Sequence, residues 1–258
     1  MALRDLDERI KTIYKTKEES VPDELLIPLL RESILYKRAV GFFSSTSLLE
    51  LSAGIGALVR NGGKIQLIAS PRLSEEDVEA ISRGYCDRER IIKESLVAAL
   101  PQIEELNVDE QNRFNLLANL ISSRVLDIRI ALIDDDEKIG IFHDKLAVLT
   151  DAVGEKVAFS GSMNETKTAL VYNYESIDVF RSWRDPENRI ELKEQTLDAI
   201  WDNREPGLET FNFPEVKELI VDKYLMAPPN YDLDKDKDSF VAASELAKTA
   251  TSRCGIVK

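Results

Sequence analysis

The chain has 258 residues, of which 43% are hydrophobic and 31% are charged, and its formal net charge is −13. This length and composition exclude a chain that is disordered over most of its length, and they suffice for one large domain with a smaller appendage. The acidic charge argues against a protein that simply coats nucleic acid, because neutralising phosphates requires surplus lysine and arginine. The acidic charge does not exclude an enzyme that has a local basic cleft.

The termini and the cysteines bear on location. The N-terminal MALRDLDERI carries charges where a signal peptide needs an apolar core, and the longest apolar runs are far too short to cross a bilayer. We therefore expect a cytoplasmic location and no membrane partner. Cys86 and Cys254 form no spaced metal motif, and we interpret both as free thiols.

The first part of the chain alternates between predicted helices and strands. Apolar residues at helical spacing predict a helix over 23–36, followed by a short extended segment at 39–44. The Ser-Ser-Thr-Ser run at 44–47 can cap a helix that continues to about Val59, where an Asn-Gly-Gly turn stops it. Residues 64–70 then form a buried strand, and this order indicates α/β layering.

A helical stretch and a group of strands follow. Residues 74–123 are predicted to be helical, in about three pieces, and to form an insertion in the sheet. The segments beyond them read as strands joined by turns, at 126–133, 139–149, 156–162 and 175–183.

The C-terminal part contains amphipathic helices at 187–202 and 214–225. Together these elements predict an α/β fold, with a mixed central β-sheet flanked by helices and a C-terminal helical appendage. We expect a main domain at 1–185, helices packed on it at 186–225, and a polar tail or linker at 226–258.

The candidate chemistry centres on His143, the single histidine of the chain, in the segment IFHDKLAVL. Residues two apart on a strand share a face, so a strand here would project His143 and Lys145 together. The next strand ends in GSMN, which places Ser162 and Asn164 at a strand's C-terminal end, where α/β proteins tend to build sites. Glu175 begins the strand after that.

These side chains suit phosphoryl transfer without a metal or any other cofactor. Imidazole is a nucleophile near neutral pH and also an acid or base, while lysine, serine and asparagine supply charge and hydrogen bonds for phosphate oxygens. A carboxylate bonded to the other ring nitrogen fixes the tautomer. Each group alone is a weak signal, because a lone histidine on a strand is more often structural. Their order and spacing together favour a catalytic site.

The motifs HDK at 143–145, GSMN at 161–164 and NYE at 173–175 resemble the phospholipase D-like nuclease superfamily, whose signature is HxKxxxxD followed by GSxxN-type residues. The nuclease branch of that family has a glutamate eleven residues after the asparagine, an interval that Asn164 and Glu175 reproduce. One departure is Thr150, which stands where the signature has aspartate. This departure argues against a lipase-type member more than against a nuclease.

The resemblance covers roughly residues 25–185, and it is closest to a subgroup found in bacterial restriction enzymes and at the N-terminus of helicase-like proteins. It implies a role for each site residue. His143 attacks phosphorus and forms a phosphohistidine. Lys145 and Asn164 bind the non-bridging oxygens with help from Ser162, and Glu175 orients the imidazole.

The resemblance also implies a dimer. The family's mechanism uses two histidines, one as the nucleophile and one to protonate the leaving oxygen, whereas this chain has only His143. Either two subunits pair so that two copies of His143 face each other across a two-fold axis, or the chain is inactive as it stands. We expect an obligate homodimer with one composite site.

We therefore predict a metal-independent DNA endonuclease of a restriction or defence system, partnered with a helicase or a sequence-recognition subunit. The sequence has no GxxxxGK[ST] loop, so these residues do not encode the helicase itself. Two alternatives stay open, a phosphodiesterase of the same family that acts on RNA or phospholipid, and a catalytically silent module that dimerises and binds DNA. The net charge of −13 favours the silent module, whereas an electropositive groove around the paired histidines would favour the nuclease.

Two weaker features complete the sequence. Residues 234–245 resemble a calcium loop, but Ser239 stands where the sharp turn needs glycine, so a solvated acidic tail is the better interpretation. The candidates for lining a DNA cleft, which sequence alone does not separate from ordinary surface charge, are Lys37, Arg38, Arg60, Arg72 and Arg181.

Overall fold

A computed structural model describes the chain at residues 2–71, 73, 88–133, 141–229 and 231. Several predictions concern residues outside these ranges. They are the first part of the predicted insertion, both cysteines, Arg72, the acidic stretch at 234–245 and nearly all of the predicted tail.

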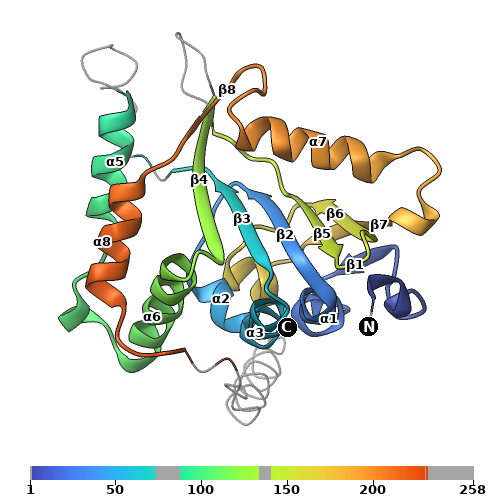
Figure 1. Cartoon of the computed structure of the whole chain (residues 1–258), viewed down its shortest axis with the longest axis horizontal. Helices are drawn as coiled ribbons and strands as arrows, with labels where there is room; N and C mark the ends of the chain where they lie inside the picture. Colours follow the sequence, from blue (N-terminus) through green and yellow to red (C-terminus); the bar gives the residue numbers. More distant parts are fainter. Residues whose placement is uncertain (1, 72, 74–87, 134–140, 230, 232–258) are drawn as a thin grey trace, which may run out of the picture.

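The centre of the molecule is one eight-stranded mixed sheet with the strand order β1-β7-β6-β5-β2-β3-β4-β8 (Figure 1). Strands β2, β3 and β4 run parallel, and every other neighbouring pair is antiparallel. The strand bounds are β1 Ile13–Lys15, β2 Ser33–Val40, β3 Lys64–Ala69, β4 Leu126–Ile133, β5 Leu146–Asp151, β6 Lys156–Gly161, β7 Ser176–Arg181 and β8 Leu208–Phe211.

Helices cover both faces of this sheet, which confirms the predicted fold class. The larger core lies under α1 (Ile27–Glu32), α2 (Thr46–Glu50), α3 (Ser52–Arg60), α6 (Val108–Ser122) and α8 (Pro214–Tyr224). The smaller core lies under α7 (Arg189–Trp201). Strand β5 shows why two cores form, since Ala147 and Leu149 face the larger one while Leu146 and Val148 face α7.

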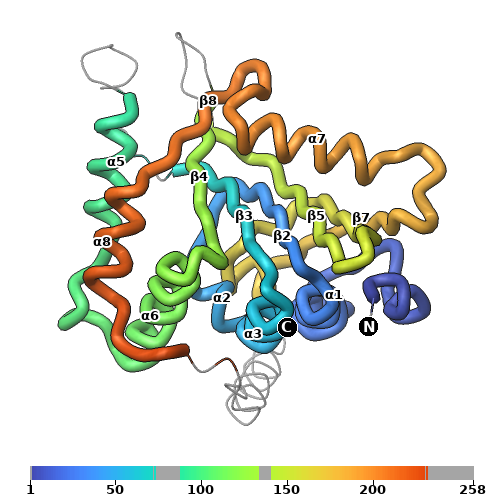
Figure 2. Tube along the Cα trace, in the orientation of Figure 1, coloured from blue at the N-terminus to red at the C-terminus, as the bar shows by residue number. Residues whose placement is uncertain are grey.

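The remaining helices extend the larger face. Helix α5 (Arg88–Ala98) packs against α8, which in turn packs against α6, so the three lie together at one end of the molecule (Figure 2). A short 3-10 turn, Ile103–Glu105, joins α5 to α6. Within the ranges described above, no helix combines the length and the apolar character of a bilayer-crossing segment.

The predicted helix over 23–36 is wrong over its last residues, 33–36. A π-helical turn at Pro22–Leu26 leads into α1, and the chain enters β2 at Ser33. Residues 33–40 become a strand because β3 pairs with them on one side and β5 on the other. These pairings satisfy the backbone along the segment, and they override the helical spacing of its apolar residues.

The C-terminal helices are α7 and α8, close to their predicted bounds. Between them β8 adds an edge strand antiparallel to β4, which was not predicted from the sequence. The C-terminal part therefore contributes to the sheet as well as covering it. The division into a domain at 1–185 and an appendage at 186–225 stays a prediction.

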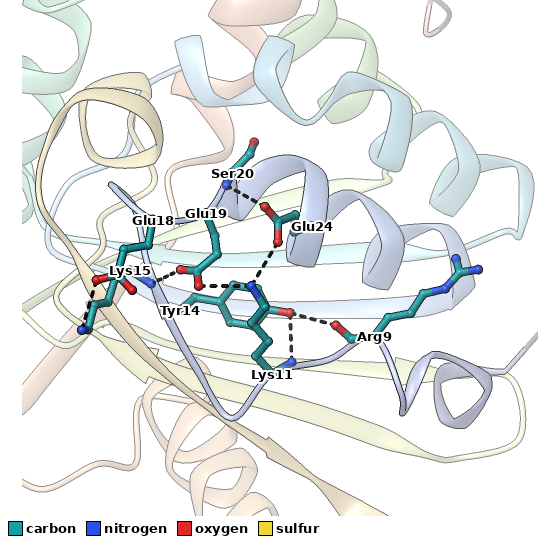
Figure 3. A network of polar contacts seen from close by, with 8 residues as sticks. All are labelled: Arg9, Lys11, Tyr14, Lys15, Glu18, Glu19, Ser20 and Glu24. Atoms are coloured by element: carbon teal, nitrogen blue, oxygen red, sulfur yellow. Dashed lines mark hydrogen bonds and ion pairs between the residues drawn. The ribbon is translucent and has the colours of Figure 1, made fainter.

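The N-terminal segment is fastened by a polar network around Lys11 (Figure 3). Lys11 Nζ lies 3.1 Å from Glu19 Oε1 and 3.5 Å from Glu24 Oε2. The backbone N–H of Lys15 donates to Glu19 Oε2 at 2.8 Å, and that of Lys11 donates to the Tyr14 hydroxyl at 3.1 Å. This network stabilises the turn that follows β1. Strand β1 itself pairs with β7, and the Thr16 hydroxyl accepts a hydrogen bond from the backbone N–H just before β7.

Candidate active site

Four strand ends meet at one edge of the sheet. Because β5 runs antiparallel to both β2 and β6, and β7 runs antiparallel to β6, the ends of β2 and β6 lie beside the starts of β5 and β7. The structure places all five predicted site residues within a few positions of these ends, namely His143, Lys145, Ser162, Asn164 and Glu175.

The prediction that His143 and Lys145 share the face of a strand is wrong. Strand β5 begins only at Leu146, and residues 141–145 belong to no regular element. Pairing stops there because both neighbours of β5 end at the same level, β2 at Val40 and β6 at Gly161. As a result His143 is exposed while Lys145 is buried.

Lys145 turns back onto its own loop. Its Nζ donates to the backbone carbonyl of His143 at 2.7 Å, and its backbone N–H donates to Asp144 Oδ1 at 2.8 Å. Burial lowers the pKa of Lys145; the Arg38 charge adds to this shift, while Asp144 and Glu175 oppose it. The ammonium group therefore fixes the loop that carries His143.

The imidazole of His143 lies against the backbone at Gly41. A Cβ at Gly41 would lie 2.6 Å from His143 Cδ2 and 3.3 Å from Asn164 Oδ1, so the position has no room for a larger residue. Asn164 Oδ1 accepts a hydrogen bond of 3.0 Å from the Phe42 backbone N–H. The Phe42 ring meets the His143 ring edge-on, at 6.3 Å between centroids. The structure thus brings His143 and Asn164 together at this glycine.

Ser162 and Glu175 form a second pair at the same edge. The Ser162 hydroxyl donates to Glu175 Oε2, and Asn173 Nδ2 donates to Glu175 Oε1 at 3.0 Å. The backbone N–H of Glu175 donates to the Thr16 hydroxyl at 2.8 Å. Among the hydrogen bonds of the described residues, none joins Glu175 to the imidazole. Within one chain, Glu175 therefore orients Ser162, and the predicted contact with His143 is not made.

The glycine of GSMN allows β6 and β7 to approach each other. A Cβ at Gly161 would lie 2.0 Å from the backbone oxygen of Ser176, a separation that real atoms do not reach. The Gly161 N–H also donates to the carbonyl of Lys145 at 3.3 Å. This glycine consequently ties the serine–asparagine segment to the strand on each side of it.

Arg38 is a site residue that the sequence indicated only as one of several possible surface cations. Its side chain is 1% exposed and lies beneath the GSMN segment. Its Nε donates to Glu165 Oε2 at 3.0 Å, and its Nη2 donates to the Met163 carbonyl at 2.6 Å. Arg38 therefore holds the backbone on both sides of Asn164. Arg38 shares its face of the strand with Tyr36 and Val40, and an arginine among buried apolar side chains was the signal that pointed to this role.

Two of the other candidate cations, Lys37 and Arg181, lie away from this edge. Lys37 faces α7, where it pairs with Glu194 and Asp198, and Arg181 pairs with Asp7 near the far end of β7. Around His143 the charges are of both signs, with Arg38 and Lys145 opposed by nearby carboxylates. Among the residues that the structure describes, the charges at the candidate site are therefore mixed in sign.

A metal site would need several ligating side chains close together. In the part of the chain that the structure describes, no group of three or more His, Cys, Asp or Glu side chains is placed to hold a metal ion. The polar groups that converge are an imidazole, an ammonium, an amide, a hydroxyl and the Glu175 carboxylate, and the first four can donate hydrogen bonds to phosphate oxygens.

A family model described as "Cardiolipin synthase, PLD-like domain" matches residues 39–201, which is more than half of the chain and includes all five predicted site residues. A comparison with curated protein sequences finds no significant match.

Three solved structures illustrate the likeness of fold. NucT from Helicobacter pylori is 16% identical, with a TM-score of 0.47, and the alignment covers 77% of this chain and 97% of NucT. The phospholipase D family member Nuc from Salmonella typhimurium is 15% identical, with a TM-score of 0.43 and coverages of 78% and 97%. Polyphosphate kinase from Porphyromonas gingivalis is 14% identical, with a TM-score of 0.44, and the alignment covers 96% of this chain but 31% of the kinase.

Proposed function

Because the chain belongs to the phospholipase D-like family and is therefore an enzyme of the phosphodiesterase class, we propose that it is a metal-independent nuclease that cleaves DNA through a phosphohistidine. The observation that carries this proposal is the setting of His143. Its imidazole is exposed, lies against Gly41 beside the Asn164 amide, and belongs to a loop fixed by a buried lysine. An accessible nucleophile on a rigid support is what attack at phosphorus requires.

The chemistry proceeds in two displacements. A ring nitrogen of His143 attacks phosphorus, and the P–N bond forms as the P–O bond to the leaving strand breaks. The imidazolium of a second His143 gives its proton to the leaving oxygen. Water then attacks the phosphohistidine, loses its proton to that second imidazole, and releases His143. Asn164 and Lys145 stabilise the charge on the non-bridging oxygens, which is the main electrostatic contribution in such reactions.

The second histidine comes from a partner copy, because the chain has only one. Large apolar side chains surround the site edge in an exposed state, with Ile141 at 59%, Tyr172 at 59% and Tyr174 at 64% exposure. An apolar rim of this kind is typical of a surface that another protein covers. A two-fold axis near His143 would bury the rim and bring the two imidazoles together.

The first experiment is cleavage of plasmid and single-stranded DNA in EDTA by the native chain and by His143→Ala. We expect EDTA-resistant cutting that falls at least about a thousandfold in the variant, because the nucleophile is lost. Acid-labile labelled DNA on the denatured native protein would support the phosphohistidine. Cutting that EDTA abolishes, or that His143→Ala retains, would overturn the mechanism.

The dimer is tested by refolding the native chain with an equal amount of His143→Ala. If both histidines serve one site, the mixture should keep about a quarter of the activity of the same total amount of native protein, because only fully native dimers act. If each chain acts alone, the mixture should keep about half. Sedimentation of the native chain as a monomer at assay concentration would also contradict the dimer.

The setting in a restriction or defence system, with a helicase or sequence-recognition partner, is proposed on the sequence resemblance alone. A phospholipid substrate is the second candidate, because the description of the matching family names a cardiolipin synthase. Phospholipid vesicles therefore belong in the same assay. Hydrolysis of the lipid without DNA cutting would replace the first proposal, and no turnover of DNA, RNA or lipid would favour the silent binding module.

A further inference from the structure

An apolar cavity of about 320 Å³ opens beside the candidate active site. The segment after β2, the end of β3 and the middle of β4 form its floor, and α5, α6 and α8, which lie together in Figure 1, form its sides. Phe42 lines the cavity and also meets the edge of the His143 ring at 6.3 Å between centroids. The cavity and the candidate nucleophile are thus separated by a single aromatic side chain.

The walls of this cavity are rich in aromatic side chains and mostly uncharged. Three further phenylalanines line it, Phe43, Phe114 and Phe213, together with aliphatic side chains of the surrounding helices. Among the lining residues that the structure describes, the one cation, Lys217, is already paired with Asp127 and bonded to Asn212. The cavity therefore favours a neutral apolar group over a second phosphate.

Ser70 adds a polar point to these walls. It lies just beyond the end of β3, its exposure is 8%, and its hydroxyl makes no hydrogen bond to any residue that the structure describes. The hydroxyl is not one of the fully buried atoms that lack a partner, so it is accessible from the cavity and can bond to a ligand there. An acyl chain would not satisfy it, whereas a planar ring with polar edges would.

We propose that this cavity binds one nucleobase of the substrate, from the nucleotide next to the scissile phosphate. The base stacks on the phenylalanines and its edge bonds to Ser70, while its own phosphate reaches His143 past Phe42. Ligand cavities run from about 300 to 1,000 Å³, and this one, at the lower end, suits a single small rigid group. Proteins that bind single-stranded nucleic acid commonly hold bases by stacking them on aromatic side chains. The inference rests on the nuclease function proposed above.

Cleavage of single-stranded oligonucleotides tests this inference, because their bases need no unpairing. Each oligonucleotide carries one abasic residue, at successive positions around the cleaved bond. We expect kcat/KM of the native chain to fall about tenfold at one position beside that bond and to stay within about twofold elsewhere, since stacking on aromatic side chains contributes roughly 1–3 kcal/mol per base.

Two matched variants locate the base. Ala99→Trp fills the cavity from its rim, whereas Ala98→Trp adds the same bulk at a neighbouring exposed residue that does not line the cavity. Ala99→Trp should lower kcat/KM about tenfold on the intact oligonucleotide but hardly at all on the one abasic at the sensitive position, since no base is then displaced. Ala98→Trp should behave as the native chain on both.

The outcomes separate this inference from the proposed function. Cleavage with a flat abasic profile, or equal effects of the two tryptophan variants, overturns the base pocket and leaves the nuclease intact. Absence of DNA cleavage by the native chain overturns both. Loss of phospholipid hydrolysis in Ala99→Trp, without any effect on DNA, would assign the cavity to an acyl chain and overturn the inference.

Discussion

Lys37 and Arg38 are neighbours in β2, yet they lie on opposite faces of the sheet and in different kinds of ionic contact. Lys37 faces α7 and shares two carboxylates, Glu194 and Asp198, with Lys156 close by on Glu194. Arg38 faces the site, is fully buried, and has Glu165 as its carboxylate partner. A partly exposed network of several charges loses little stability when one member is removed, whereas a buried pair loses much because the remaining charge is left without a partner. The difference teaches that burial and the choice of partner, rather than the charge itself, mark the residue that serves the site.

Replacing Arg38 should give the largest effect. Arg38→Met leaves Glu165 buried and unpaired, which typically costs about 3–5 kcal/mol, and it frees the Met163 carbonyl beneath the site. We expect urea unfolding to show this loss and DNA cleavage to disappear with it. Arg38→Lys, which restores charge but not the two-point contact, should recover stability more than activity. Native-like cleavage by Arg38→Met would remove Arg38 from the site.

Replacing Lys145 should lower the cleavage activity without lowering the stability of the fold. Lys145→Met removes a charge whose pKa burial holds below its ordinary value, so the folded state disfavours that charge. We expect cleavage to fall about 10²–10³-fold, as for the loss of one transition-state donor, while the Tm is no lower than that of the native chain. A clear fall in Tm would show that the hydrogen bond to the His143 carbonyl outweighs the burial of the charge.

The same pKa shift fixes the sign of the pH dependence. Because the folded pKa of Lys145 is lowered, the unfolded chain binds more protons between that value and the ordinary pKa of 10.5, and the contribution of this residue to stability rises with pH in that window. The stability difference between Lys145→Met and the native chain should therefore be widest below the window and narrow through it. Unfolding titrations at several pH values measure this difference.

Gly41 should affect catalysis more than folding. In Gly41→Ala the new methyl group lies 2.6 Å from the His143 ring, so the exposed imidazole has to shift away from its native position. We expect kcat to fall about a hundredfold, as for displacement of a catalytic group by about 1 Å, with little change in KM. Unchanged cleavage would mean that the imidazole acts from another position.

Lys37→Met should give the smallest effect and completes the comparison with Arg38. Glu194 keeps Lys156 as a partner, so we expect a loss of about 1 kcal/mol in urea unfolding and cleavage within about twofold of native. A loss as large as that of Arg38→Met would show that the α7 face also supports the site.

The elements that could be predicted from the sequence are those with a strong local pattern. Strands β3, β4 and β6 and helices α7 and α8 lie within a few residues of their predicted bounds. Strands β1 and β8 were missed because each is only three or four residues long and is defined by its partner. The end of α1 at Glu32 and the start of β5 at Leu146 are likewise set by neighbouring strands that no local window contains.

The site shows the same division. The motif spacing identified five residues, and the fold brings all of them to one edge of the sheet. The motif spacing did not predict the contacts that hold these residues in place, because several of their partners are remote in sequence. Arg38 and Glu165 are 127 residues apart, and Thr16 and Glu175 are 159 apart. Side-chain contacts over such separations depend on the completed sheet.

The hydroxyl of Thr16 has a consequence for how members of this family are recognised. It donates to the Asn173 carbonyl at 2.5 Å and accepts a hydrogen bond from the N–H of Glu175. The segment just after the first strand therefore holds the backbone at the last acid of the motif. A related gene product that began after this residue would keep every letter of the motif, yet the backbone N–H of its glutamate would lack the threonine hydroxyl as a hydrogen-bond partner. Motif searches would count it as intact, and only an alignment that extends to the N-terminal strand would tell the two apart.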